Sequence, residues 1–226
     1  MLDDLATESS IKDCDWYIPE LNDKKKEIIT RAQRVKYAVQ AGLPDDFVST
    51  TLKVDVGRAT QKYTKLIERL SAFTHINATT FDITQSAERK LADEALTTFV
   101  LVLKTIDDCR SRVESKVERR AKDALTDELF AHSVDALEEI ATHHTVHGAE
   151  IEELNLKSMD SATIVFSATG FLDCELQYGS DGDYSRGDGL RVEDSYPLKC
   201  KLVADISTPL DLEVQDLCVD NSSFYE

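Results

Sequence analysis

The stretch SAERKLADEALTTFVLVLKTIDDCRSRVESKVERRAK, residues 86–122, decides the fold because it contains neither glycine nor proline. Apolar side chains recur along it at the spacing of an amphipathic α-helix: Leu91, Ala95, Phe99, Val102, Ile106, Cys109, Val113 and Val117. An unbroken helix here would be roughly 55 Å long, at about 1.5 Å per residue. A helix of that length spans a bundle and can pair with a second copy, so one expectation is a homo-oligomer through this helix.

Three further helices are expected around this one, and together they make residues 1–148 a helical domain. Helical periodicity and nearby cap residues predict ranges of about 22–42, 55–73 and 126–144. Asn22 or Asp23 would cap the first of them, and Gly42 would end it. Residues 1–20 are expected to form a loose N-terminal arm.

After Gly148 the apolar period changes from helical to two, which is typical of β-strands with one buried face. The alternating positions are Ile164 to Ala168, Leu172 to Tyr178, Leu198 to Ile206 and Leu210 to Val214. Short turns between such runs predict an antiparallel meander. The sequence therefore predicts an α+β protein, with a helical bundle at 1–148 and a small antiparallel β domain at 149–226.

The net charge of −17 is concentrated in the second part. Residues 149–226 carry 5 Lys and Arg against 17 Asp and Glu, giving −12, whereas residues 1–148 carry 21 against 26, giving −5. Binding to nucleic acid depends on neutralising phosphates, so direct contact of the β domain with DNA or RNA is disfavoured. A basic protein partner is the simpler expectation.

The start of the chain, Met1-Leu2-Asp3-Asp4-Leu5, lacks the basic and apolar regions of a secretory signal. The longest apolar run, Phe99 to Leu103, is too short to cross a bilayer. Five widely spaced cysteines form no C-x-x-C pair, which indicates reduced thiols and disfavours zinc. These observations predict a cytoplasmic protein that does not enter membranes.

The glycine-rich segment 179–189 carries three carboxylates, on Asp181, Asp183 and Asp188. Oxygen ligands of this kind suit Mg²⁺ or Ca²⁺, and a bound divalent ion could activate water for phosphodiester cleavage. The spacing does not fit an EF-hand, because Arg186 stands where that motif needs glycine. The competing interpretation, which we favour, is a long hairpin loop in which Gly and Asp satisfy the turn backbone.

Histidines and one basic helix face give two further sets of candidates. His75 could act as a general base, or could be a helix cap. His143, His144 and His147 could hold a transition metal, but a helix C-terminus stabilised by histidine is the favoured interpretation. Arg112, Lys116 and Arg119 share one helix face, which could bind phosphate or an acidic partner, or could simply be solvated.

Several short stretches, taken in order, resemble a known family. They are Thr74-His75-Ile76-Asn77 with Thr80-Phe81, Ala141-Thr142-His143-His144, Glu175 to Ser180 with Asp183 and Gly187-Asp188-Gly189, Ser195-Tyr196-Pro197, Val219-Asp220 and Ser222-Ser223-Phe224. This set is similar to the predicted prokaryotic PIWI-associated nucleases over roughly residues 60–226. The resemblance implies a setting in bacterial anti-phage defence, a larger defence protein as partner and, by the family's label, cleavage of nucleic acid.

Two functions therefore stay open. The first is an accessory or effector component of anti-phage defence that acts mainly by protein–protein interaction, through the helical bundle and the acidic β domain. The alternative is a divalent-metal-dependent nuclease in the same setting. The sequence contains no phosphate-binding glycine loop and no nucleophile elbow, so no known enzyme motif decides between them.

Overall fold

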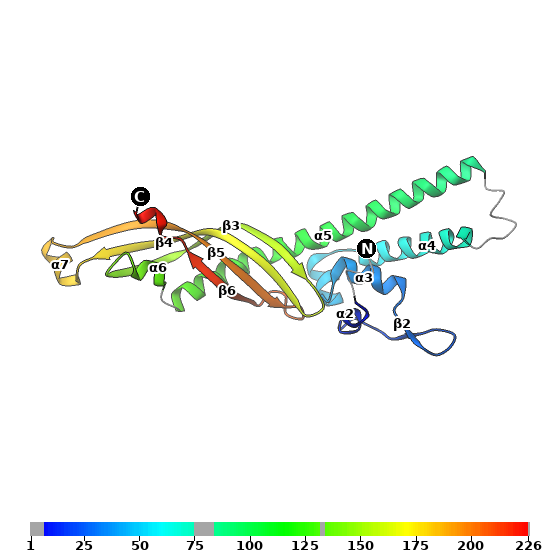
Figure 1. The fold of residues 1–226 in the computed structure, drawn as a ribbon, viewed down its shortest axis with the longest axis horizontal. Helices are drawn as coiled ribbons and strands as arrows, with labels where there is room; N and C mark the ends of the chain where they lie inside the picture. The colour runs from blue at the N-terminus through cyan, green and yellow to red at the C-terminus, as the bar shows by residue number, and fades with distance from the viewer. Residues whose placement is uncertain (1–6, 75–83, 132–133, 226) are drawn as a thin grey trace. The chain divides into compact units, whose positions relative to one another are not determined.

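The computed structural model describes residues 7–74, 84–131 and 134–225, and it confirms the α+β class. Helices dominate the first part of the chain, and a four-stranded antiparallel sheet forms the last part (Figure 1). The chain divides into two compact units, residues 1–113 with 160–162 and residues 114–159 with 163–226. The division into domains at residue 148 stays a prediction.

The described part of the N-terminal arm is packed rather than loose. Residues Glu8–Lys12 form α2, in which Ile11 is fully buried. The indole Nε1 of Trp16 donates a hydrogen bond to the carbonyl oxygen of Ala41 at 2.8 Å, and the Lys36 ammonium lies 4.5 Å from the centre of the Trp16 ring. The aromatic residue therefore anchors this segment to the following helix.

The first predicted helix is wrong in its start. Glu20–Leu21 (β1) and Glu27–Ile28 (β2) form a short antiparallel hairpin, and the Asn22 side chain accepts the backbone N–H groups of Lys24 and Lys26 in its turn. Asn22 thus closes a turn instead of capping a helix. The helix α3 is Arg31–Gln40, and Thr30 caps it in a capping box with Gln33.

The next helices of unit 1 follow the predicted pattern. After α3 the chain forms one short π-helix, η1 (Phe47–Leu52), and then α4 (Val56–Thr74). The long helix α5 is Gln85–Ala131, so the uninterrupted helix expected from residues 86–122 is confirmed. Its N-terminal part contacts α4, where the Tyr63 and Phe99 rings meet edge to face at 6.0 Å and Arg69 pairs with Glu94.

The predicted fourth helix is wrong. Thr126 lies inside α5, and α6 is the single turn Asp135–Glu138. His143 begins the strand β3 (His143–Met159), which pairs with β4 along its length. Pairing along so long a strand outweighs the weak helical signal of residues 139–144.

The sheet is a meander in chain order, β3-β4-β5-β6, as predicted for the second half of the chain. Its remaining strands are β4 (Thr163–Tyr178), β5 (Leu190–Asp205) and β6 (Leu212–Val219). β4 and β5 pair without a register shift from Thr163↔Asp205 to Tyr178↔Leu190. β6 pairs only with Leu198 to Ala204 of β5, so it covers half of that strand.

β3 is an edge strand that carries three register shifts against β4, at Val146/Gly148, Ile151/Glu153 and Leu156/Ser158. Each shift inserts one unpaired residue, which bends and twists the strand locally. Irregular edges of this kind are poor templates for a further strand. The outer edge of β3 is therefore blunted.

One face of the sheet is buried against the C-terminal part of α5. Its fully buried side chains include Phe166, Leu172, Leu176 and Leu202 from the strands and Leu125 from the helix. The backbone N–H of Leu156 donates to the Glu114 carboxylate at 2.7 Å, which ties β3 to the helix. The opposite face carries the polar residues of the alternation.

All five cysteines are free thiols, and Cys218 is the exposed one. Over the described residues, no helix has both the length and the apolar character needed to cross a membrane.

Candidate functional site

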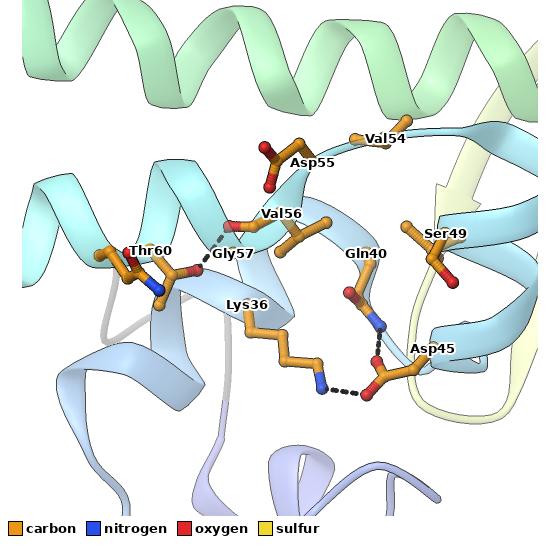
Figure 2. Close-up of a pocket in the computed structure, with 11 residues that line it drawn as sticks. Lys36, Gln40, Asp45, Ser49, Val54, Asp55, Val56, Gly57 and Thr60 are labelled. Carbon is orange, nitrogen blue, oxygen red and sulfur yellow. Dashed lines mark hydrogen bonds and ion pairs between the residues drawn. The ribbon is translucent and has the colours of Figure 1, made fainter.

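A pocket of about 490 Å³ lies in unit 1 between α3, η1 and the start of α4 (Figure 2). The Lys36 ammonium lies 2.7 Å from Oδ2 of Asp45, and the buried Gln40 amide donates to Oδ1 of Asp45 at 2.9 Å and to the Leu43 carbonyl. Both carboxylate oxygens of Asp45 are thus occupied by donors of the same chain. The pair is electrically neutral and holds η1 against α3.

The far wall of this pocket is the start of α4. Asp55 caps that helix, since its Oδ1 accepts the backbone N–H of Arg58 at 2.9 Å, and Figure 2 shows it apart from Lys36 and Asp45. Lys53 ends η1 in a left-handed conformation at φ 57°. Short π-helices and strained non-glycine residues are frequent at functional sites, so the pocket is a candidate for binding a small polar ligand.

The Asp-rich segment forms a helix between β4 and β5, where a loop was predicted. Residues Asp181–Arg186 make α7, and Ser180 and Asp183 cap it in a capping box. The Asp183 carboxylate accepts from Ser180 N at 2.9 Å, from Ser180 Oγ at 2.7 Å and from Arg186 Nη2 at 2.6 Å. These hydrogen bonds, led by that of the Ser180 side chain, lower the pKa of Asp183.

The structure does not bring Asp181, Asp183 and Asp188 together as metal ligands. Asp181 Oδ1 accepts from Gln177 Nε2 at 3.0 Å and lies 3.7 Å from the Arg191 guanidinium, while Asp188 is exposed. Among the residues that the structure describes, no group of three or more His, Cys, Asp or Glu side chains could hold a metal ion. The binding of Mg²⁺ or Ca²⁺ by this segment stays a prediction without geometric support.

A structural role for Asp183 gives a testable result. Ser180→Ala should cost about 1 kcal/mol of local stability because the cap is lost, and Asp183→Ala should loosen the same helix. Because the folded pKa of Asp183 is lowered, its contribution is present above the ordinary carboxyl pKa and is lost as the pH falls through the lowered value. Hydrogen exchange at the amides of 184–187 measures both effects. Unchanged exchange in either variant would contradict the role.

The predicted basic face and histidines lie on different elements. Lys116 and Arg119 are exposed on α5, and Arg112 Nη1 donates to the Leu52 carbonyl at 2.8 Å, so Arg112 anchors the end of η1. His143, His144 and His147 belong to β3 and not to a helix terminus, which corrects the favoured interpretation. His143 pairs with Gln177 and His144 with Leu176, so they occupy successive strand positions. His75 lies outside the described residues.

An acidic hollow lies on β4 and β5 toward their α7 end, and sequence reasoning did not find it. It measures about 460 Å³, and its lining is His147, Asp173, Cys174, Glu193, Asp194 and Ser195. The cross-strand pairs Asp173↔Ser195 and Glu175↔Glu193 place the carboxylates of Asp173 and Glu193 on one face of neighbouring strands, while Asp194, opposite Cys174, belongs to the other face. The signal in the sequence was the pair Glu193-Asp194, which the hairpin register sets opposite Asp173 to Glu175.

The basic residues near this hollow are already engaged. Arg191 donates to Gln177 Oε1 at 2.9 Å, lies 3.6 Å from Glu175 and stacks over the Tyr184 ring at 4.3 Å. Asp173 and Glu193, by contrast, have no hydrogen-bonding or ionic side-chain partner in the described part of the chain. Burial raises the pKa of the Cys174 thiol to about 11, so Cys174 is not a nucleophile at neutral pH.

The outer edge of β5 is open beside the hollow. On the side of β5 away from β4, no described strand pairs with residues 190–197. The Pro197 carbonyl accepts from Asp220 N at 2.8 Å, and Ser195 N is satisfied by the Asp194 side chain at 2.9 Å. Because backbone groups alternate in direction along a strand, Arg191 and Glu193 direct their N–H and C=O groups away from β4. This edge can accept one extended segment.

Comparison with known proteins assigns the whole chain to one family. Residues 1–99 and residues 106–225 match two family models, and both models carry the description "Predicted pPIWI-associating nuclease". Comparison with curated proteins and with solved structures gives no match. The second model alone covers more than half of the chain. The protein therefore belongs to the family of predicted pPIWI-associating nucleases.

Proposed function

We propose that this protein is an accessory or effector component of a bacterial anti-phage defence system and acts mainly by binding another protein. The description of its family supports a pPIWI protein as the partner. The binding surface is the acidic end of the sheet, made of the hollow around Asp173 and Glu193 and the open edge of β5. A basic, extended segment of the partner is the matching surface.

The observation that carries this proposal is the set of carboxylates that lack partners. Asp173 and Glu193 are exposed and unpaired among the described residues, whereas Arg191 and Arg186 are engaged by carboxylates of the same chain. An incoming Lys or Arg therefore finds acceptors without displacing an internal ion pair. The same charge repels a nucleic-acid backbone, so direct contact of the sheet with DNA or RNA is disfavoured.

Charge reversal in the hollow tests the proposal. The double variant Asp173→Lys with Glu193→Lys should weaken binding to the purified pPIWI protein of the same organism by at least about tenfold, since each reversed charge turns an attraction into a repulsion. Binding of the wild-type chain should also weaken as salt rises from about 50 to about 300 mM, because exposed charges are screened. Calorimetric titration measures both effects.

The matched control is Asp211→Lys with Glu213→Lys, which makes the same charge change at two exposed carboxylates where the connection between β5 and β6 ends. That connection is at the opposite end of β5 from α7, so binding should stay at the wild-type level. If the control weakened binding as much as the double variant, the effect would come from net charge alone. That result would contradict a binding surface located at the hollow. Undiminished binding of the double variant would exclude the hollow.

The second candidate is a divalent-metal-dependent nuclease, which the family description supports only in naming a predicted nuclease. Under this proposal His75 would act as the base, Asp188 would contribute to metal binding, and Arg112, Lys116 or Arg119 would hold phosphate. The test is incubation of the chain, alone and with the pPIWI protein, with single- and double-stranded DNA and RNA in Mg²⁺ or Mn²⁺. Cleavage that is lost in His75→Ala and Asp188→Ala would support it, and intact substrates under all conditions would exclude it.

A further inference from the structure

The N-terminal part of α5 exposes an apolar stripe on one helix face. Leu96, Phe99, Val100 and Leu103 are 66%, 46%, 49% and 60% exposed, and Phe99 borders α4, where its ring meets that of Tyr63. Their spacing of three, one and three residues places them on one side of the helix over two turns. No residue from Ala95 to Leu103 is charged. This spacing is typical of a surface along which two helices pack against each other.

The inward face of the same segment has its own apolar side chains. Thr98, Thr105 and Cys109 are buried on the side of the helix opposite Leu96 and Leu103, and the half-buried Leu91, Leu101 and Val102 lie near them. The exposed stripe is therefore a second apolar face, and a helix with two apolar faces is typical of one that packs against two neighbours.

The charges that flank the stripe are arranged as mirror opposites about its centre. Four acidic and basic positions on the N-terminal side match positions of opposite sign on the C-terminal side: Glu88 with Arg110, Arg89 with Asp107, Lys90 with Asp108, and Asp93 with Lys104. The midpoint of every pair falls between residues 98 and 99, beside Phe99. The remaining charge in the segment, Glu94, is already paired with Arg69 of α4.

These eight side chains make no hydrogen bond or ion pair with any residue that the structure describes. A second α5 helix running antiparallel, centred near Phe99, would bring three of these pairs against each other: Glu88 with Arg110, Arg89 with Asp107, and Asp93 with Lys104. Lys90 and Asp108 point away from the stripe and stay outside the contact. The antiparallel arrangement would also set Leu96 close to Leu103 of the other copy. A parallel second copy would place Asp107 against itself, which is repulsive.

We infer that the protein is an antiparallel homodimer through the exposed stripe of α5. The occupant is a second copy of this chain, because the charge pattern is complementary to itself only when the direction of the helix is reversed. The inference goes beyond the proposed function and does not rest on it, since it concerns α5 and not the acidic end of the sheet. Each copy would contribute the acidic end of its own sheet, so the dimer would carry two of these surfaces.

The apolar stripe is tested by a paired substitution. The wild-type chain should sediment at twice its mass of 25.3 kDa. Leu96→Asp with Leu103→Asp should shift it to the single mass, with far-UV circular dichroism unchanged because both side chains are exposed in the single chain. The matched control is Leu21→Asp, since Leu21 is 65% exposed in the β1–β2 hairpin. This control should remain a dimer.

The antiparallel direction is tested by charge exchange. Arg89→Glu with Asp93→Lys, and separately Lys104→Asp with Asp107→Lys, should each weaken the dimer by at least about tenfold, since two-fold symmetry repeats each change at both ends. All four substitutions in one chain restore opposite charges in the antiparallel arrangement alone. Dimer affinity should then return close to the wild-type value.

Three results would overturn the inference. They are a wild-type chain that sediments at the single mass at about 50 μM, a dimer that survives the double aspartate substitution, and a fourfold exchange that restores nothing. A single-mass chain whose stripe is protected from hydrogen exchange only when the pPIWI protein is added would assign the stripe to that partner. Loss of pPIWI binding in the hollow variants would leave the dimer unaffected, so the two proposals fail separately.

Discussion

Gly170→Ala is expected to unfold the sheet. Gly170 of β4 pairs with Ile151 of β3 beside a register shift, and a Cβ atom at this position would lie 1.9 Å from the carbonyl oxygen of Glu150 and 2.9 Å from its carbon. The obstacle is the backbone of β3, so no side-chain rotation relieves the clash. We expect a loss of at least about 3 kcal/mol in the free energy of unfolding, above the usual range for overpacking.

Gly148→Ala is the matched control for this clash. Gly148 belongs to the neighbouring strand, and a Cβ atom there meets nothing within 4 Å. Alanine loses less backbone entropy than glycine on folding, so this variant should be within about 0.5 kcal/mol of the wild type or slightly more stable. Urea denaturation followed by circular dichroism separates the two. Equal midpoints for both variants would show that β3 and β4 do not approach as described.

Phe166→Ala should be nearly as damaging, with a loss of about 3 to 5 kcal/mol. Phe166 is fully buried on the helix-facing side of β4, where its neighbours across the strands are Leu156 and Leu202. Removing the ring leaves a cavity in a layer that one helix covers and that cannot collapse freely. The free energy of unfolding in urea measures the loss.

Phe171→Ala tests whether this loss depends on the face of the sheet. Phe171 is on the same strand, and its odd number places it on the opposite face, where it is half-buried. Phe171→Ala should lower the free energy of unfolding by less than half as much as Phe166→Ala does. If the two variants lost equal stability, α5 would not cover the even-numbered face.

The helices of unit 1 could be predicted where periodicity and breakers agree. Residues 86–122 contain nothing that ends a helix, and α5 follows them closely at its N-terminal end. At its C-terminal end the helix continues to Ala131, through Thr126, because buried Leu125 and Leu129 prolong its apolar seam. A threonine can begin a helix, but at Thr126 the burial of the neighbouring apolar side chains continues α5 instead.

β3 escaped prediction because of its register shifts. Its apolar positions Val146, Ala149, Ile151, Leu154 and Leu156 are separated by three, two, three and two residues. Each shift adds a residue, so the strict alternation that marks a strand is lost and a spacing close to that of a helix results. β4 and β5 pair without a shift, and their alternation was read correctly.

The candidate site was only partly within reach of the sequence. The acidic character of the C-terminal part was visible in its composition, but the hollow around Asp173 and Glu193 depends on the hairpin register. The carboxylates of the glycine-rich segment were visible too. Their use as helix caps and as partners of Arg186 and Arg191 depends on the formation of α7.

The two borders of the sheet differ in a way that limits how far it can grow. Three insertions disrupt the β3 border, while the β5 border stays regular and unoccupied over residues 190–197. A ribbon that accepts a neighbour on one side only terminates after a single addition instead of extending into a fibre. Beside residues 190–197 the sheet can therefore gain one strand next to β5, while the irregular β3 border on the other side does not accept a second.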